Sequence, residues 1–260
     1  MPKKILALFM LSLVLVFVSA CFAPKTTNEL VKHKYQPQNL IELIDLARNL
    51  EINLGEIDTS KITNMNHLFF QSPRKDFSGI ETWDTSKVTD MQGMFSGAEF
   101  FNYNINSWDV SKVEDMSYMF NEAYSFNKPL NKWNTSKVTD MTGMFRRARF
   151  FNQNINVWNT SKVESMRAMF AQAYSFNKPL DKWDTSKVWD MAAMFFNAYS
   201  FNKNISSWNI SKVTDINYMF NGAKVFNQNI NTWNTSKIKF MDNVFRNSPL
   251  EQNPPKWYKE

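Results

Sequence analysis

A serine followed by a lysine recurs at a fixed interval, and this pair is the feature of the sequence that most resembles catalytic machinery. The pairs run from Ser86-Lys87 to Ser236-Lys237, once every 25 residues. Serine–lysine catalysis needs one serine nucleophile, one amine that takes its proton and one oxyanion pocket. Seven copies in register do not fit a single active site, whereas serine is a common turn residue. We therefore interpret the pairs as structural parts of a repeat.

Side chains that could hold a metal ion or relay protons are sparse. The chain contains two histidines, His33 and His67, and one cysteine, Cys21. These residues are too few for a metal cluster or an acid–base relay, and the sequence has no glycine-rich phosphate loop. Methionine and aromatic rows recur at fixed stages of the unit, as core packing requires. We expect no catalytic residue, no metal site and no cofactor.

The single cysteine ends a sequence typical of export. Residues 1–21 read MPKKILALFMLSLVLVFVSAC, with a basic start, an apolar run and small residues before Cys21. A secretory signal has this layout, and its end resembles the bacterial lipobox, in which the cysteine thiol is diacylated. The run is shorter than the roughly 20 residues of a spanning helix, so an uncleaved anchor is the lesser alternative. We predict a signal peptide over residues 1–20 and a lipidated Cys21 with a flexible tether over 21–37.

This anchor would place the protein on the extracellular face of the cell membrane. Removal of Lys3 and Lys4 with the signal would lower the formal charge from +6 to +4, which is mild. Lysines and aspartates are interspersed, as on a solvated surface of mixed charge. Export also argues against a nucleic-acid partner. Because no second cysteine remains for a disulfide, the exported part must be stable through packing.

The lysines of the serine–lysine pairs form a row that could attract a polyanion. If the coils stack at the distance between strands, neighbouring ammonium groups would lie about 5 Å apart and repel each other. Nearby aspartates can offset this charge, and they lie at positions 84, 90, 109, 115, 140, 184, 190 and 215. We interpret the row as part of the mixed-charge surface, with polyanion binding as the alternative.

Tryptophan marks the repeat at an unbroken interval of 25 residues, at Trp83, Trp108, Trp133, Trp158, Trp183, Trp208 and Trp233. Valine, methionine, phenylalanine and alanine follow at fixed stages of each unit. A unit this short cannot bury its apolar face alone, so stacked units must share a core. We predict a repeat solenoid over residues 57–248 with about eight coils. The first coil is degenerate, with Ile57 in place of tryptophan.

Each coil is predicted to contain a short strand and a short helical turn. The strand would follow the tryptophan, and the helical turn would cover Met91–Gly97 and its equivalents. Aspartate at the position of Asp90 would cap that turn, a pattern that Phe240 breaks. Asparagines at the position of Asn102 would form a buried ladder that satisfies the backbone of the return loop.

Residues 38–56 are predicted to form a capping helix and a lead-in to the coils. Apolar residues from Leu40 to Leu50 recur at three- and four-residue spacing, and Asn39 with Glu42 forms a capping box. The polar face of this helix is not notably basic, which argues against membrane-surface binding. Residues 249–260 would form a cap or tail at the other end.

The complete unit resembles the repeats of the BspA-like leucine-rich-repeat surface proteins, particularly the lipoprotein branch common in mycoplasma-type bacteria. The resemblance covers residues 57–248 and rests on the pattern W-[DN]-[TVI]-S-K-V-x-[DS]-M-x-x-M-F-x-x-A-x-x-F-N. It implies a right-handed solenoid on the cell surface, a role in attachment, host-protein binding or antigenic variation, and no known catalytic residues. The sequence departs from the pattern at the array ends, chiefly at Ile57 and Phe240.

If the repeated positions build the coils, the variable positions must carry recognition. They are rich in tyrosine and arginine, which protein interfaces favour, and the candidate surface comprises Tyr124, Arg146, Arg147, Arg149, Arg167, Tyr174 and Tyr199. Ordinary exposed variation is the alternative. We expect a membrane-anchored recognition or adhesion protein without catalysis, whose partner is a protein or glycan of a host or neighbouring cell. A passive envelope or antigenic protein is the second possibility, and the oligomeric state is left open.

Overall fold

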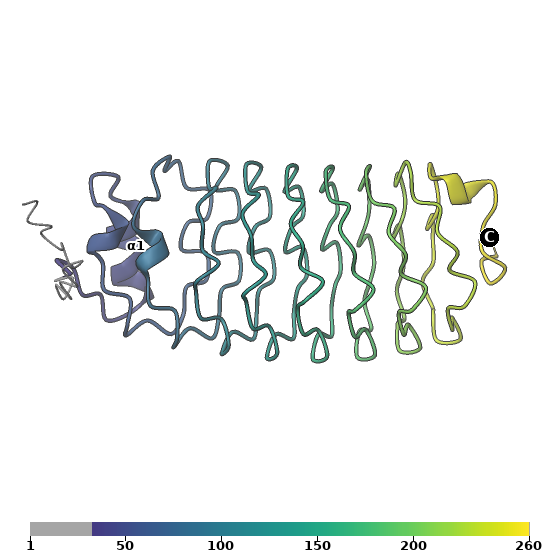
Figure 1. Cartoon of the computed structure of the whole chain (residues 1–260), viewed down its shortest axis with the longest axis horizontal. Helices are drawn as coiled ribbons and strands as arrows, with labels where there is room; N and C mark the ends of the chain where they lie inside the picture. Colours follow the sequence, from purple (N-terminus) through teal and green to yellow (C-terminus); the bar gives the residue numbers. More distant parts are fainter. Residues whose placement is uncertain (1–32, 260) are drawn as a thin grey trace, which may run out of the picture. The chain divides into compact units, whose positions relative to one another are not determined.

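The computed structural model describes residues 33–259, which wind into coils stacked side by side (Figure 1). His33–Glu260 forms one compact unit, with the helix α1 at one end of the stack and the C-terminus at the other. The predicted repeat character is confirmed. The predicted signal peptide, Cys21 and most of the predicted tether lie outside the described residues.

The α-helix α1 spans Leu40–Arg48 and begins at the predicted capping box. The backbone N–H of Glu42 donates a 3.0 Å hydrogen bond to Oδ1 of Asn39, and the Asn39 amide donates a 2.8 Å bond back to the Glu42 carboxylate. Leu43 and Ala47 are buried in the hydrophobic core, whereas Ile41 is exposed. The helix therefore covers one end of the stack with a single apolar face.

Neighbouring coils are joined by isolated parallel bridges. Asp90 pairs with Asp115, and the same register continues from coil to coil as far as the pairing of Asp215 with Phe240. The other elements of the described residues are three 3-10 turns, η1 (Leu54–Glu56), η2 (Ile80–Thr82) and η3 (Pro249–Glu251). The short strands and helical turns predicted for every coil do not form in residues 33–259.

Left-handed backbone conformations explain why Met91–Gly97 is not helical. Gly93 and Gly97 have φ angles of 56° and 73°, and the equivalent residues have positive φ in every coil up to Asn243 and Asn247. As a result, alternate N–H groups point along the stack. The Gly93 N–H, for example, donates a 2.8 Å hydrogen bond to the Ser117 carbonyl of the next coil. Backbone groups that a helix would pair internally are satisfied by the adjacent coil instead.

Aspartate at the bridge position starts a turn and does not cap a helix. Oδ1 of Asp90 accepts a 2.9 Å hydrogen bond from the N–H of Gln92, and Asp115 does the same for Ser117 at 2.7 Å. A bond from a side-chain oxygen to the N–H two residues later defines an Asx turn. The predicted hydrogen-bonding role of these aspartates is correct, but the predicted helix cap is wrong because left-handed residues follow.

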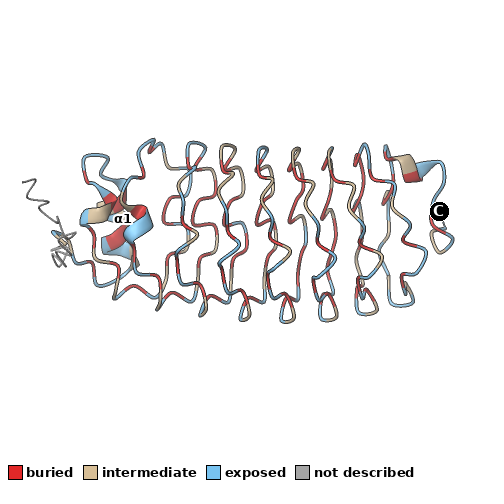
Figure 2. Cartoon of the chain, viewed as in Figure 1, coloured by how far each residue is buried: buried red, intermediate tan, exposed pale blue. Residues whose placement is uncertain are grey.

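The core consists of aromatic columns that run from coil to coil, and buried residues recur in every coil of the stack (Figure 2). Phe95 stacks on Phe120 of the next coil at 5.6 Å between ring centroids, and on Phe101 of its own coil at 3.8 Å. The seven tryptophans of the 25-residue row are buried beside these columns, each 3–5% exposed. Stacked rings at such distances add to the stabilisation that burial provides, so every coil depends on its neighbours for its apolar contacts.

A buried arginine fastens the helix to the first coil. The guanidinium of Arg74 donates to the backbone carbonyls of Ala47, Asn49 and Ile52, with the shortest distance, 2.6 Å, to Asn49. Burial lowers the pKa of Arg74, yet an arginine retains its charge in proteins. A cation at the C-terminal end of a helix is also favoured by the helix dipole. Arg74 lies between Ile57 and Trp83, which are 26 residues apart, one more than the interval between later coils.

The C-terminal residues continue the tryptophan row. Trp257 follows Trp233 after 24 residues, stacks on it at 6.1 Å and donates a 2.9 Å hydrogen bond to the Ile230 carbonyl. The tail predicted over residues 249–260 therefore supplies one more member of the row. Because Trp257 follows Trp233 after 24 residues and not 25, the 25-residue pattern of the sequence did not include Trp257.

Candidate functional site

A row of stacked side chains crosses four neighbouring coils on the surface. The Arg149 guanidinium carbon lies 4.5 Å from the Tyr124 ring centroid and 5.9 Å from that of Tyr174. The rings of Tyr174 and Tyr199 stack at 4.7 Å with an angle of 4° between their planes. Cation–π and ring stacking contacts therefore order the row. We call Tyr124, Arg149, Tyr174 and Tyr199 the tyrosine–arginine row.

The coil register produces this alignment. Each member occupies the same stage of its coil, directly after a buried alanine such as Ala148 and two residues before a buried phenylalanine such as Phe151. The chain is anchored in the core on both sides, so the residue between projects outward. Because successive coils lie about 5 Å apart, as hydrogen-bonded strands do, the planar groups come within stacking distance.

Arg147 lies in a neighbouring row and is held by two partners. Its Nη1 contacts Oε1 of Glu122 at 2.5 Å, and its Nε donates a 2.7 Å hydrogen bond to Oε1 of Gln172. These partners belong to the coils on either side. The positive charge of Arg147 is therefore compensated within the stack, and its guanidinium is less available to a ligand than that of Arg149.

Arg167 and Arg146 do not join the tyrosine–arginine row. Arg167 belongs to a different stage of the coil, and its Nη1 lies 3.3 Å from Asp190 and 3.6 Å from Asp215. Arg146 is half-buried, and its side chain forms no hydrogen bond or ion pair with another described residue. The four arginines of the predicted centre therefore occupy different stages of the coil and have different partners, and their joint role in binding stays a prediction.

An exposed phenylalanine extends the row, and the predicted surface did not include it. Phe150 follows Arg149 directly and is 61% exposed. Three coils have serine at this stage, at Ser125, Ser175 and Ser200, whereas Phe100 and Val225 are exposed apolar residues like Phe150. Apolar residues at a stage that holds serine in the other coils were therefore the available sequence signal.

The lysine row is exposed and forms no ion pair among the described residues. Its members are exposed in every coil, and the ion pairs of residues 33–259 involve Lys34, Arg147 and Arg167 instead. Asp84 accepts a 2.9 Å hydrogen bond from the N–H of Ser86 and forms no ion pair with Lys87. The predicted offset of the lysines by aspartates is therefore not realised as ion pairs in the described residues.

The serines of the serine–lysine pairs close turns, as predicted. Oδ1 of Asp109 accepts a 2.9 Å hydrogen bond from the N–H of Ser111. Bonding to the Ser111 hydroxyl, and then to its backbone N–H, lowers the pKa of Asp109, and Ser186 acts in the same way on Asp184. Asn134 takes this place in another coil and binds the N–H of Ser136. The serines are therefore part of the turn architecture.

Asparagines of the return loop form the predicted ladder. The N–H of Asn127 donates a 3.0 Å hydrogen bond to Oδ1 of Asn102, and Asn152 bonds to Asn127 in the same manner. The ladder continues to Asn227. These asparagines are exposed or half-buried, so the prediction that they are buried is wrong. The bonds add a side-chain link between coils on the side of the return loop.

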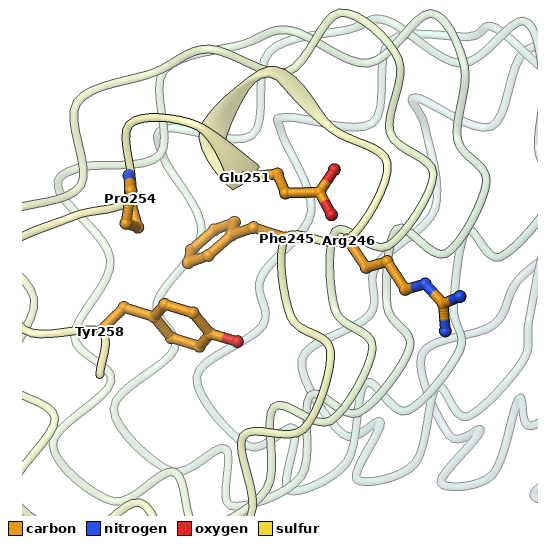
Figure 3. A pocket seen from close by; sticks show the side chains of 5 residues that line it. All are labelled: Phe245, Arg246, Glu251, Pro254 and Tyr258. Carbon is orange, nitrogen blue, oxygen red and sulfur yellow. The ribbon is translucent and has the colours of Figure 1, made fainter. Parts of the chain in front are cut away.

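A hollow of about 230 Å³ lies at the C-terminal end of the stack (Figure 3). Tyr258 packs edge-on against Phe245 at 5.0 Å, and Glu251 accepts a 2.9 Å hydrogen bond from the N–H of Asn247. The guanidinium of Arg246 extends away from both rings (Figure 3). These contacts close the last coil at the C-terminal end of the stack.

Among the described residues, no group of three or more histidine, cysteine, aspartate or glutamate residues is placed to hold a metal ion. None of the helices within residues 33–259 has the length and hydropathy needed to cross a membrane.

Comparison with known proteins identifies a family but no characterised relative. The family model described as "Mycoplasma protein of unknown function, DUF285" matches residues 38–156, 69–180 and 147–257. The overlapping matches fit a tandem repeat, since one model aligns with the array in three registers. No curated protein matches the chain. With matches that extend from residue 38 to residue 257, the chain belongs to this family of mycoplasma proteins of unknown function, DUF285.

Proposed function

We propose that the protein recognises another macromolecule through the tyrosine–arginine row and performs no catalysis. The observation that carries this proposal is the position of the Arg149 guanidinium between the rings of Tyr124 and Tyr174. Tyrosine and arginine dominate the binding energy of protein interfaces. Because the row is ordered by its own stacking, binding would immobilise few side chains and lose little entropy.

The chemistry of the row favours a partner that carries carboxylate or sulfate groups beside apolar ones. Arg149 supplies a cation whose N–H groups can bind such anions. Phe150 follows Arg149 directly and Tyr199 lies two coils along the row, and both are exposed and supply apolar surface. A protein or glycan on a host or neighbouring cell would offer this combination.

The lipid anchor belongs to the same proposal. The ending Val18-Ser19-Ala20-Cys21 supports diacylation of Cys21, which would hold the stack on the extracellular face of the cell membrane. The resemblance of the 25-residue unit to BspA-like repeats supports a right-handed leucine-rich-repeat-like solenoid with a role in attachment. Mass spectrometry of the N-terminal peptide tests the anchor, since diacylation adds a mass that an unmodified cysteine lacks.

Binding by the whole chain, purified in detergent, tests the recognition role. We expect the double variant Arg149→Ala with Tyr174→Ala to lose about thirtyfold or more in affinity for host cells, since the loss of even one interface hot spot costs about 2 kcal/mol or more. Lys178→Ala with Lys203→Ala is the matched control, because both lysines belong to the return loop. Undiminished binding by the first variant would rule out the tyrosine–arginine row as the site.

A passive envelope or antigenic protein is the second candidate function. It is favoured by the internal pairing of Arg147 with Glu122 and of Arg167 with Asp190. In such a protein, surface charges would stabilise the stack and contact no ligand. Saturable binding of the wild-type protein to cells or matrix would exclude this function, and its absence would favour it.

A further inference from the structure

We propose that the exposed lysines of the coils form a binding ridge for a linear polysaccharide that carries sulfate or carboxylate groups. This lysine ridge is a different surface from the tyrosine–arginine row, and the proposal does not depend on that row. The ridge consists of Lys87, Lys112, Lys137, Lys162, Lys187, Lys212 and Lys237.

The coil geometry places these lysines in a line. Each one sits in a turn directly before a core residue, such as Val88 or Val138, that is fully buried in nearly every coil. The core residue anchors the turn, so the lysine side chain extends into solvent. With a rise of about 5 Å per coil, the seven ammonium groups span roughly 30 Å along the stack. A straight row of cations at a regular spacing suits an extended chain of anions.

The charge of the ridge is offset only in part by its surroundings, since the electrostatic interaction of Lys112 with Asp109 and of Lys187 with Asp184 contributes to the lowered pKa of these aspartates. The residue three positions before each ridge lysine lies in the same turn, and it is aspartate in three coils, at Asp84, Asp109 and Asp184. The other four coils have asparagine there, including Asn134 and Asn159 in the centre. The aspartates hydrogen-bond to the following serines, and within residues 33–259 no ridge lysine lies in an ion pair. Adjacent ammonium groups repel, and a bound polyanion would relieve that repulsion.

The side chains around the ridge favour a polysaccharide over a membrane or a nucleic acid. Membrane-surface elements set large apolar residues beside their cations. Of the large exposed apolar residues in the described chain, Trp189 alone lies within two positions of a ridge lysine. Binding to single-stranded nucleic acid relies on aromatic platforms and arginine, and the ridge offers neither in rows. Its serine, asparagine and aspartate neighbours are instead suited to hydrogen bonding with sugar hydroxyl groups.

Heparin binding by the whole chain in detergent tests the proposal with a variant matched in charge. The ridge variant carries Lys112→Gln, Lys137→Gln, Lys162→Gln and Lys187→Gln. The control variant carries Lys128→Gln, Lys132→Gln, Lys178→Gln and Lys182→Gln, which removes the same charge from the return loop and its neighbouring turn. We expect the ridge variant to lose about tenfold or more in affinity with a shallower dependence on salt, because fewer counterions are released. The control should stay within about threefold of the wild type.

The remaining outcomes are equally decisive. Equal losses of heparin affinity in both variants would mean that only the net charge matters, and this result would overturn the proposal. Failure of the wild-type protein to bind heparin at physiological salt would also overturn it. A preference for phosphatidylserine over phosphatidylcholine vesicles that the ridge variant loses, with no loss of heparin binding, would assign the ridge to the membrane and also overturn the proposal. A third variant with arginine at the four ridge positions should restore binding, and circular dichroism should match the wild type throughout. Arg149→Ala with Tyr174→Ala should retain heparin binding, which separates this proposal from the tyrosine–arginine row.

Discussion

The indole N–H of Trp158 donates a 2.9 Å hydrogen bond to the backbone carbonyl of Leu130 in the preceding coil. The same bond joins Trp183 to Ile155 at 3.1 Å and continues along the row. Each tryptophan therefore fills the core of its own coil and satisfies a buried carbonyl of the coil before it. The stability of a repeat array is the sum of the stabilities of its units and of their interfaces. This hydrogen bond therefore contributes to the interface between neighbouring coils.

Removing Trp158 should destabilise the array strongly. We expect Trp158→Ala to lower the free energy of unfolding by about 3–5 kcal/mol, as large-to-small core substitutions do. Trp158→Phe keeps a ring but leaves the Leu130 carbonyl unpaired, at a cost of about 1–3 kcal/mol. Urea unfolding monitored by circular dichroism measures both. Lys162→Gln, an exposed change in the same coil, should stay within about 0.5 kcal/mol of the wild type, and equal stability of all three variants would contradict the role of Trp158.

Gly143 should resist substitution because Tyr118 of the preceding coil lies over it. A Cβ added at Gly143 would lie 2.6 Å from the Tyr118 ring, and the residue has a φ of 58°. We expect Gly143→Ala to cost about 1–3 kcal/mol, the range for overpacking. Adding Tyr118→Ala should recover most of that loss, since Ala168 and Ala193 form such a pair naturally with positive φ. A double-mutant cycle by urea unfolding checks this, and additive effects of the two changes would refute the contact.

The aspartates of the serine turns should make stability depend on pH. The pKa of Asp109 and of Asp184 is lowered in the folded protein, chiefly by the hydroxyl groups of Ser111 and Ser186. A lowered folded-state pKa stabilises the protein above the ordinary aspartate pKa of about 3.9, and this contribution is lost as the pH falls through the lowered value. Thermal melts between pH 6 and pH 3 should therefore show a falling Tm.

Asparagine substitution isolates this effect. Asp109→Asn with Asp184→Asn should retain the turns, because Asn134 already accepts the N–H of Ser136 at 3.2 Å. The variant should lose less Tm than the wild type over the same pH range, since two titrating groups are gone. Parallel Tm profiles for the two proteins would show that these carboxylates do not contribute.

Arg74 should be essential for holding α1 on the stack. We expect Arg74→Met to cost about 3 kcal/mol or more, because each buried acceptor left unpaired costs about 1–3 kcal/mol. The loss should be local, with faster hydrogen exchange at the amides of Leu43 and Ala47 than in the central coils. Arg48→Met, an exposed change in the last turn of α1, is the matched control. Uniform exchange changes along the whole array would argue against a local clamp.

The sequence by itself determined the repeat, its period and the residues that are buried. Tryptophan and phenylalanine rows at a 25-residue interval are buried in the structure because identical units can cover their apolar faces only by stacking. The capping box at Asn39 could also be predicted from the sequence, because it depends on two residues that are three positions apart. These features follow from local spacing and from the need to bury apolar surface.

Tertiary structure decided the backbone of each coil and the pairing of its surface charges. The stretch Met91–Gly97 has helical spacing, but hydrogen bonds to the next coil select left-handed conformations that no single unit would adopt. Arg147 and Arg149 are two residues apart, yet one meets Glu122 and the other meets Tyr124, both 25 residues earlier in the chain. The partner of each side chain therefore lies in an adjacent coil, and only the register of the stack decides which residues meet.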